Sequence, residues 1–249
     1  MSRIDLTETV ARFTLRPAAG TLPFEPGQYF ALGLVVDGRL VQRPYSTASA
    51  AGRGRDLEFL VRLVDRGTFT PRLWALRLGA RIRLGRAKGL FTLRPGDPRA
   101  HLFIATGTGI APLVSMLEAL AAGEAAWPRN DDTPRAVVVH GVARVGELAY
   151  RDRIEGMAGG PTRIRYSPLI SRPTHPDNAR WTGLTGRIDA RLDELCDVHR
   201  LAPADSVAYL CGNPAVIAAT ELILARRGFA RDAIVSEQYW PAEPNAEAG

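Results

Sequence analysis

Hydrophobic and polar positions change their spacing about two fifths of the way along the chain. In the first part, short runs alternate between apolar and polar side chains or are apolar throughout, at residues 11–15, 29–36, 57–64 and 81–84. Turns rich in glycine and proline separate these runs. Short strands at such intervals predict an antiparallel β-barrel or sandwich. One helix is expected in this part, over residues 71–78, with Thr70 as its N-cap and a proline in its first turn.

From residue 99 onwards, apolar runs of strand length alternate with longer runs of helical spacing. The expected strands are residues 101–105, 136–140, 163–170, 207–210 and 234–239, and the expected helices are residues 111–122, 148–158, 188–195 and 215–227. This alternation is typical of a parallel sheet with crossover helices. We therefore predict two domains, an antiparallel β-barrel over residues 1–98 and a parallel-sheet α/β domain over residues 99–240. A polar C-terminal tail, residues 241–249, follows them.

The composition is that of a folded protein rather than a disordered one. Of the 249 residues, 46% are apolar and 23% are charged, which excludes disorder over most of the chain. The two cysteines, Cys196 and Cys211, are too few for a disulfide framework or a four-thiolate iron–sulfur site. The uncharged stretch 102–117 contains two glycines and a proline and is shorter than the about 20 residues that a membrane span needs. With no secretory leader visible, we expect a cytoplasmic protein without stable membrane association.

The charge balance favours an acidic partner but does not indicate which class of acidic partner it is. The net charge is +6 and the isoelectric point is about 9.9. Nucleic acid, an anionic surface, an acidic protein and a phosphorylated ligand all remain open on charge alone. The arginines are scattered with no long basic run, which disfavours nucleic acid. No metal-ligating cluster is evident, and none is expected.

Two stretches in the first part carry chemistry that suits a flavin nucleotide. The run Arg43-Pro44-Tyr45-Ser46 offers a guanidinium for a phosphate, a flat ring and a hydroxyl. A strand that happens to carry an arginine, an aromatic residue and a turn serine is the alternative. The run Gly67-Thr68-Phe69-Thr70 leads into the expected helix, whose N-terminus favours an anion. Ordinary helix capping is the alternative there.

Two glycine-containing loops in the second part follow strands and precede helices. The loop 106–112 reads Thr106-Gly107-Thr108-Gly109-Ile-Ala-Pro, and its glycines allow the backbone to approach a pyrophosphate. It departs from the Gly-x-Gly-x-x-Gly fingerprint, because position 112 is proline and no acidic residue follows about 20 positions later. The second loop reads Cys211-Gly212-Asn213-Pro. Both loops are expected at the carboxyl edge of one sheet, where ligands bind in open α/β domains.

Three further groups of residues are ambiguous by themselves. Cys211 either approaches a nicotinamide ring or is a small buried hydrophobe. Ser171, Arg172 and Arg187 suit a 2′-phosphate, although surface arginine is an equal alternative in so arginine-rich a chain. The run Glu237-Gln-Tyr239-Trp240 offers two aromatic rings that either stack on a flat ligand or pack into the core.

Taken in order, these stretches resemble the ferredoxin–NADP(+) reductase family, and in particular its bacterial subclass. The shared sequence features are Arg-x-Tyr-Ser, Gly-x-x-Thr, Gly-Leu-Phe-Thr-Leu, Ala-Thr-Gly-Thr-Gly-Ile-Ala-Pro, Val-Val-His-Gly-Val, Glu-Leu-Ala-Tyr-Arg, Ser-Arg, Thr-Gly-Arg-Ile, Cys-Gly-Asn-Pro and Glu-x-Tyr-Trp. They extend over residues 5–240. Each feature alone is weak evidence for the resemblance, but the complete set in this order is specific to the family.

The resemblance implies an FAD-binding barrel and an NADP(H)-binding α/β domain. For FAD, it assigns the pyrophosphate to Arg43, one flavin face to Tyr45, the vicinity of flavin N5 to Ser46, and the other flavin face to Tyr239. The remaining FAD contacts that it implies are Pro44, Thr68, Phe69, Thr70, Thr108 and Trp240. Ser46, Tyr45, Cys211 and Glu237 are the implied catalytic residues.

For NADP(H), the resemblance assigns the pyrophosphate to the loop 106–112 and the 2′-phosphate to Arg172 and Arg187. The full implied set is Thr106, Gly107, Gly109, Arg144, Ser171, Arg172, Arg187, Cys211, Gly212 and Asn213. The chain departs from the family at one of these places, because alanine stands at position 143 where an arginine is usual and Arg144 follows it. The chain also carries Pro173 after Ser-Arg, and it extends nine residues beyond Trp240.

The implied function is electron transfer between NADP(H) and an acidic ferredoxin or flavodoxin, by hydride transfer to flavin N5 followed by single-electron steps. A monomer is expected. The alternative is an NAD(P)H-dependent reductase component of an oxygenase system. The missing cysteines exclude a cluster carried by the chain itself.

Overall fold

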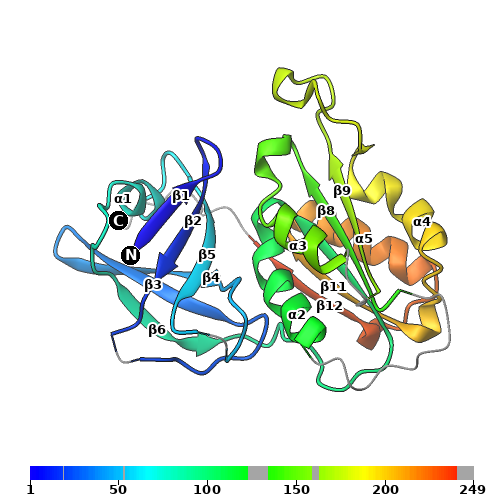
Figure 1. Cartoon of the computed structure of the whole chain (residues 1–249), viewed down its shortest axis with the longest axis horizontal. Helices are drawn as coiled ribbons and strands as arrows, with labels where there is room; N and C mark the ends of the chain where they lie inside the picture. Colours follow the sequence, from blue (N-terminus) through cyan, green and yellow to red (C-terminus); the bar gives the residue numbers. More distant parts are fainter. Residues whose placement is uncertain (19, 53, 123–133, 159–162, 240–249) are drawn as a thin grey trace, which may run out of the picture.

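The computed structural model describes residues 1–18, 20–52, 54–122, 134–158 and 163–239. In Figure 1, antiparallel strands in blue and cyan form one half of the molecule, and a parallel sheet with helices on both faces forms the other. The predicted class, an antiparallel β-barrel followed by a parallel-sheet α/β domain, is confirmed. The predicted boundary at residues 96–98 lies between the last strand of the first half and the first strand of the second.

The first half consists of two three-stranded antiparallel sheets. Its elements are β1 (Ser2–Asp5), β2 (Val10–Leu15), β3 (Tyr29–Val36), β4 (Arg39–Ser46), β5 (Leu57–Arg62), α1 (Thr70–Trp74) and β6 (Arg83–Lys88). The strand orders are β1-β2-β5 and β4-β3-β6, and a single bridge between Thr47 and Phe59 joins the sheets. Alternate side chains point inward, so that Phe13, Phe30 and Phe59 are fully buried in the shared core.

Four elements of this half differ from the sequence prediction. Strands β1 and β4 were not expected, and the strand expected at residues 81–84 is β6, which runs from residue 83 to residue 88. The helix expected over residues 71–78 ends at Trp74 because tertiary contacts of the first strand intervene. Arg3 donates to the Trp74 carbonyl oxygen, and the Gly79 N–H donates to the Met1 carbonyl oxygen.

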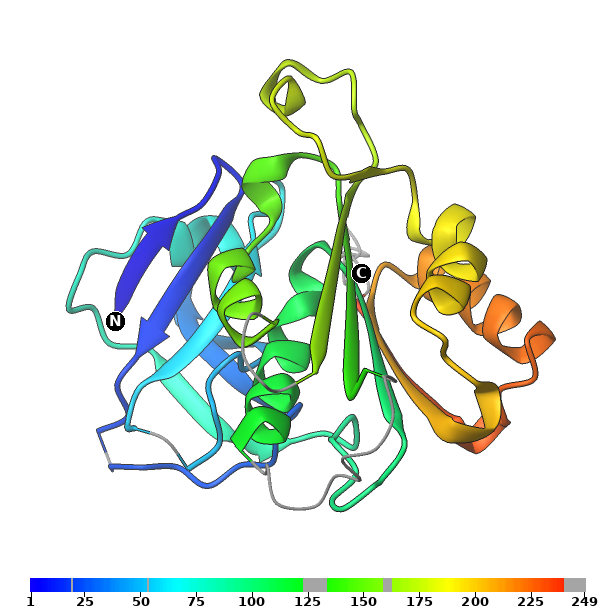
Figure 2. The same ribbon diagram turned by 45° about the vertical axis from the view of Figure 1, so that its right-hand side comes forward.

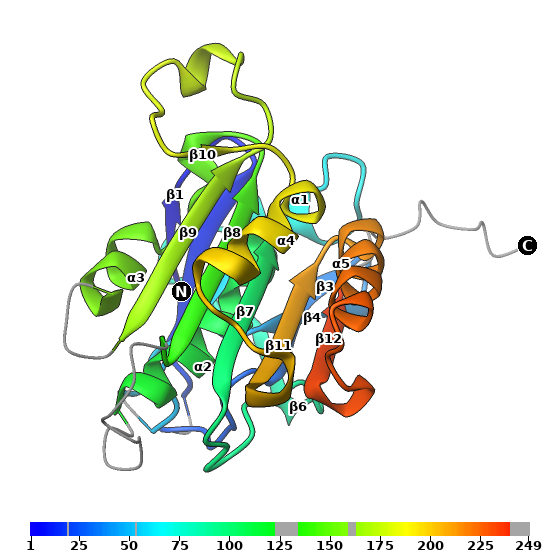
Figure 3. The same cartoon turned by 90° about the vertical axis from the view of Figure 1, so that its right-hand side faces the viewer.

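The second half is a six-stranded sheet in which all neighbouring strands are parallel. Its strands are β7 (Ala100–Thr106), β8 (Ala136–Val142), β9 (Ile164–Ile170), β10 (Leu184–Thr185), β11 (Ser206–Gly212) and β12 (Ile234–Gln238), and its helices are α2 (Ile110–Ala122), α3 (Arg151–Ala158), α4 (Ile188–Val198) and α5 (Pro214–Arg226). The order is β10-β9-β8-β7-β11-β12. Figure 3 shows α2 and α3 on one face of the sheet and α4 and α5 on the other. Every expected strand and α-helix of this half is present, and among its described residues the one additional strand is the two-residue β10.

The bounds of every expected element of this half differ from the prediction by one to three residues at one or both ends. Helix α3 begins at Arg151 rather than at residue 148, because Tyr150 has a left-handed backbone (φ 61°) that a helix does not continue through. Helix α4 continues three residues further than expected, to Val198. The last strand ends at Gln238, one residue early.

The two halves share an apolar interface. Helices α2 and α3 lie between the barrel and the parallel sheet (Figure 2). Val10, Ala48 and Leu60 of the barrel belong to the same buried cluster as the residues of α2. The Ser115 hydroxyl donates to the Ser49 carbonyl oxygen across this interface at 2.7 Å. In the described part of the chain, every helix is too short or too polar to cross a lipid bilayer.

Candidate active site

The run Arg43–Ser46 lies on β4, an edge strand of its sheet. Because alternate side chains of a strand face opposite sides, Arg43 and Tyr45 share one side, whereas Pro44 is exposed on the other. An edge strand tolerates a proline, since its outer N–H has no ladder partner to lose. The Tyr45 ring lies 5.8 Å from the ring of Phe69. The two stretches that were predicted to hold a flavin nucleotide are therefore neighbours.

The turn before α1 differs in detail from the prediction. Phe69, not Thr70, stands at the N-cap position, and its side chain makes no capping hydrogen bond. The Thr70 hydroxyl instead accepts from the Val64 N–H at 2.9 Å and donates to the Val64 carbonyl oxygen at 3.2 Å. Thr70 is buried, so its hydroxyl closes the loop 64–70. Thr68 is half-buried beside it, and its carbonyl oxygen accepts from Arg72.

Side chains from both halves meet where β4 ends. The buried Ser46 hydroxyl donates to Glu237 Oε1 at 3.1 Å. Glu237 lies on β12 directly opposite Cys211 of β11. The Tyr239 N–H donates to the Gly212 carbonyl oxygen at 2.8 Å, and its side chain packs against the buried cluster that contains Cys211. The structure thus brings together four residues that the sequence places in three separate stretches.

Burial controls the protonation of these groups. It raises the pKa of Glu237, and the hydrogen bond from Ser46 offsets part of that increase. It also raises the pKa of the Cys211 thiol and of the Tyr239 phenol well above their ordinary values. Both are therefore neutral near pH 7, so Cys211 is not a thiolate nucleophile here.

The two glycine loops pack back to back at the carboxyl edge of the sheet. A Cβ on Gly109 would lie 2.2 Å from the Cys211 carbonyl oxygen, and a Cβ on Gly212, whose φ is +137°, would lie 2.1 Å from Thr106 Oγ1. The Asn213 N–H donates to that same Thr106 oxygen at 2.7 Å. The predicted meeting of these loops is therefore explained, because β7 and β11 are adjacent and parallel.

Residues within the loops have distinct local roles. Asn213 is the N-cap of α5, and its Oδ1 accepts from the N–H groups of Ala215 and Val216. Gly107, Thr108 and Gly109 form a 3₁₀ turn, η1 (Gly107–Gly109), that runs directly into α2. The N–H groups at such a helix start have no partner within the helix. An anion can therefore bind to them.

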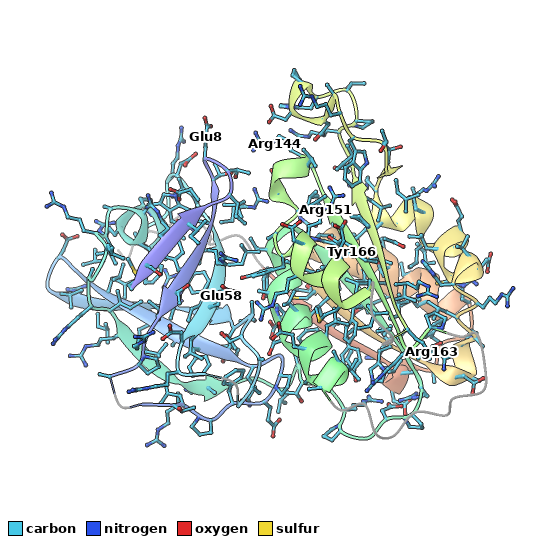
Figure 4. All side chains as sticks on the ribbon, in the orientation of Figure 1. Glu8, Glu58, Arg144, Arg151, Arg163 and Tyr166 are labelled. Carbon is cyan, nitrogen blue, oxygen red and sulfur yellow. The ribbon has the colours of Figure 1, made fainter. Side chains whose placement is uncertain are left out.

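The arginines predicted to meet a 2′-phosphate lie near the ends of β8, β9 and β10. Ser171 and Arg172 follow β9 and are exposed, and Arg187 precedes α4. Arg187 is paired with Asp189 at 3.0 Å. Arg144, which Figure 4 labels, pairs with Glu147 at 3.2 Å and with Asp177 at 3.5 Å. The more exposed pairs, Arg187 with Asp189 and Arg144 with Asp177, contribute little stability, roughly 0–1 kcal/mol each, so a ligand phosphate can compete with these carboxylates.

Three residues beside this site were not predicted from the sequence as site residues: Arg62, His140 and Glu147. Glu147 is buried and receives Arg62 of β5 on Oε2 at 2.9 Å and Arg144 on Oε1. His140 ends an apolar run on β8 and lies below Gly107. The spacing of Arg144 and Glu147 was a visible sign of their pairing. Nothing local indicated the contact with Arg62. Trp240 and the tail 241–249 lie outside the described residues.

An antiparallel barrel joined to a parallel α/β domain, with polar side chains of both meeting at two glycine loops, defines a flavin- and nicotinamide-dependent oxidoreductase. Residues 3–92 match the oxidoreductase FAD-binding domain, and residues 103–221 match the oxidoreductase NAD-binding domain. The chain belongs to the ferredoxin–NADP reductase family. It is 35% identical over 222 residues to ferredoxin–NADP reductase B of Sorangium cellulosum (strain So ce56), which covers 87% of this chain and 85% of that protein.

Two solved structures agree with this assignment. The ferredoxin NADP+ reductase from Neisseria gonorrhoeae, a structure with bound FAD and NADP, superposes with a TM-score of 0.78 at 25% identity, covering 94% of each chain. The Amycolatopsis cytochrome P450 reductase superposes with a TM-score of 0.80 at 28% identity, covering 97% of this chain and 68% of that one. The same fold therefore serves electron acceptors of more than one kind.

Proposed function

We propose that this chain transfers electrons between NADPH and a one-electron carrier protein, ferredoxin or flavodoxin, by way of bound FAD. One observation carries the proposal: Ser46 of the barrel is hydrogen-bonded to Glu237 of the α/β domain, with Cys211 and Tyr239 beside them. A site assembled from two nucleotide-binding domains suits a reaction between two nucleotides.

The residues of the barrel fit FAD. A half-buried guanidinium, an aromatic ring and a buried hydroxyl follow one another along β4, at Arg43, Tyr45 and Ser46. We assign the FAD pyrophosphate to Arg43 and the loop 67–70, and the flavin ring to Tyr45 and Tyr239. Bound there, FAD would supply a hydride acceptor and a one-electron donor, and these residues would orient and tune it.

The residues around Ser46 manage protons and exclude water. Ser46 holds its hydroxyl proton toward Glu237, and the raised pKa of Glu237 lets this carboxyl take up a proton closer to neutral pH. Cys211 is completely buried and neutral. We assign it to the wall behind the nicotinamide site, where a small uncharged side chain keeps water out.

The loop 106–112 and the arginines are assigned to NADP(H). The helix start after η1 offers N–H groups to the pyrophosphate. Arg172 and Arg187 are assigned to the 2′-phosphate, with Arg144 as a third cation. The pairing of Arg144 and Arg187 with carboxylates favours a weaker preference for NADPH than free guanidinium groups would give. It also supports the second candidate function, a reductase component of an oxygenase system that accepts NADH.

The distribution of charge supports an acidic carrier that docks on the barrel. Residues 1–98 carry 16 basic and 8 acidic side chains, whereas residues 99–249 carry 16 and 18. The whole positive excess therefore lies in the half that holds β4. Opposite charge accelerates the encounter of two proteins, and added salt screens it.

The test begins with the absorption spectrum of the purified holoenzyme and its anaerobic bleaching by NADPH and by NADH. Tight FAD and faster bleaching by NADPH, followed by reduction of a ferredoxin or flavodoxin that slows with salt, is the expected result. Faster bleaching by NADH would move the protein to the oxygenase-reductase function. A protein that cannot be loaded with FAD would overturn both. In Ser46→Ala, an unchanged rate of bleaching would remove Ser46 from the assigned role.

A further inference from the structure

His140 occupies a buried position directly beneath the glycine loop of β7. Its Nε2 lies 3.0 Å from the carbonyl oxygen of Gly107, and its Nδ1 lies 3.3 Å from the hydroxyl oxygen of Tyr166. The side chain is completely buried. Tyr166 comes from β9, beside α3 (Figure 4). The imidazole therefore links β8 to the turn that follows β7 and to Tyr166, the third residue of β9.

The geometry determines where the ring proton lies. A carbonyl oxygen only accepts hydrogen bonds, so Nε2 must carry the hydrogen and donate to Gly107. Nδ1 is then the acceptor, and the Tyr166 hydroxyl donates to it. Burial lowers the pKa of His140 to about 4, which agrees with a neutral ring, and burial also raises the pKa of Tyr166. Each hydrogen-bonding atom of the pair has one defined role.

The Gly107 carbonyl determines how the loop faces its ligand. It accepts from the Ile110 N–H within η1 as well as from His140. The first bond closes the turn, and the second ties the turn to β8. A peptide unit is planar and trans, so its C=O and the following N–H point in opposite directions. Holding the Gly107 carbonyl toward His140 thus aims the Thr108 N–H away from the sheet core.

We propose that His140 is a positioning residue for the nicotinamide nucleotide, and that Tyr166 holds it in the tautomer that can do so. His140 does not touch the nucleotide; it acts through the Gly107–Thr108 peptide, whose N–H faces the pyrophosphate. Gly107 is suited to this strained turn by its φ of +53°. The inference rests on the proposed binding of the nucleotide pyrophosphate by the loop 106–112.

The test is calorimetric titration of the FAD-loaded holoenzyme with NADP+, for the wild type, His140→Leu, His140→Gln and Tyr166→Phe. The glutamine amide can still donate to Gly107, whereas leucine has a similar size and no donor. We expect His140→Leu to weaken NADP+ binding about 3- to 10-fold, the usual effect of one lost hydrogen bond. We expect His140→Gln to recover most of the affinity, and Tyr166→Phe to weaken binding by a smaller factor.

The control is His199→Gln. His199 follows α4 and forms a similar imidazole–hydroxyl pair with Ser167, which lies next to Tyr166 on β9. Its Nε2 and the Ser167 Oγ are 3.0 Å apart, but His199 has no hydrogen bond to the loop 106–112. Steady-state kinetics add a second readout. A positioning role predicts a higher KM for NADPH in His140→Leu with kcat nearly unchanged, whereas a general loss of packing lowers kcat and FAD content together.

The outcomes separate the inference from the function on which it rests. Wild-type holoenzyme that does not bind NADP+ would overturn the proposed function and this inference with it. Wild-type binding with equal affinity in His140→Leu would overturn the inference alone. Equal weakening in the leucine and glutamine variants, or a matching loss in His199→Gln, would also overturn it, because the donor would then be irrelevant. Weakening by leucine with recovery by glutamine supports it.

Discussion

The substitution Gly109→Ala, which adds one methyl group, tests how tightly the two glycine loops are packed. In Gly109→Ala, the new Cβ would lie 2.2 Å from the carbonyl oxygen of Cys211, 2.5 Å from its carbonyl carbon and 2.8 Å from the nitrogen of Gly212. Non-bonded carbon contacts are comfortable at about 3.5 Å, so the overlap is roughly 1 Å. All three atoms belong to the backbone of β11 and its loop. No side-chain rotation can relieve the clash, and the strand end must move.

The expected cost lies at the upper end of the range for overpacked cores, about 3 kcal/mol. For a chain of this size, each 1 kcal/mol lowers Tm by about 2–4 °C, so Gly109→Ala should unfold about 6–12 °C below the wild type. The assay is thermal unfolding of the holoenzyme followed by circular dichroism. Gly156→Ala is the matched control, because a Cβ there has nothing within 4 Å. Helix propensity should make that variant up to about 1 kcal/mol more stable.

The reasoning is refuted if Gly109→Ala unfolds within about 2 °C of the wild type while Gly156→Ala behaves as expected. That result would mean that the end of β11 yields without strain. The same variant reports on function. Moving the Cys211 backbone changes its register with Glu237, so we expect slower flavin bleaching by NADPH even where FAD content is normal.

Three further predictions follow from the charged groups and from the burial of the cysteines. Because burial raises the pKa of Glu237, the folded protein binds more protons than the unfolded chain just above the ordinary glutamate pKa, so stability falls as pH rises through that window. Glu237→Gln should flatten this fall in Tm as the pH rises above the ordinary glutamate pKa of about 4.3; an unaltered profile would contradict it. Asp189→Asn frees Arg187 and should raise the ratio of kcat/KM for NADPH over NADH several-fold, and an unchanged or lower ratio argues against the 2′-phosphate assignment. Cys196 and Cys211 are both buried, so a thiol reagent should label neither until the protein unfolds; rapid labelling of the native protein would show that the interior opens.

The elements of the α/β domain could be predicted from the sequence because their spacing is a local property. The barrel was harder. The sequence did not indicate strand β4, because Pro44 and the exposed Leu40 interrupt its alternation. The proline is tolerated because β4 is an edge strand. Helix α1 was overextended since its end is set by Met1 and Arg3, about 70 residues away. Tertiary contacts of this kind leave no mark on local periodicity.

Some features of the site could likewise be predicted from the sequence, whereas others depend on tertiary contacts. The meeting of the Gly109 and Gly212 loops follows from the rule that parallel strands end at one edge. The contact of Ser46 with Glu237 joins residues 191 positions apart, and only the resemblance to a family connected them. His140 looked like the last residue of an apolar strand. Its function became visible only when the structure placed the Gly107 carbonyl on one side of it and Tyr166 on the other.

The interface between the halves explains why a site divided between them can keep its geometry. Strand β5 presents Arg62 to Glu147 and Glu58 to Arg153, two ion pairs of opposite polarity. The apolar cluster around α2 is common to the barrel and the parallel sheet. A barrel displaced along the interface would break both pairs and expose this cluster. The Ser46–Glu237 contact therefore depends on packing at a distance as well as on its own hydrogen bond. A fixed separation between the two nucleotide-binding halves is the condition that direct transfer between their ligands requires.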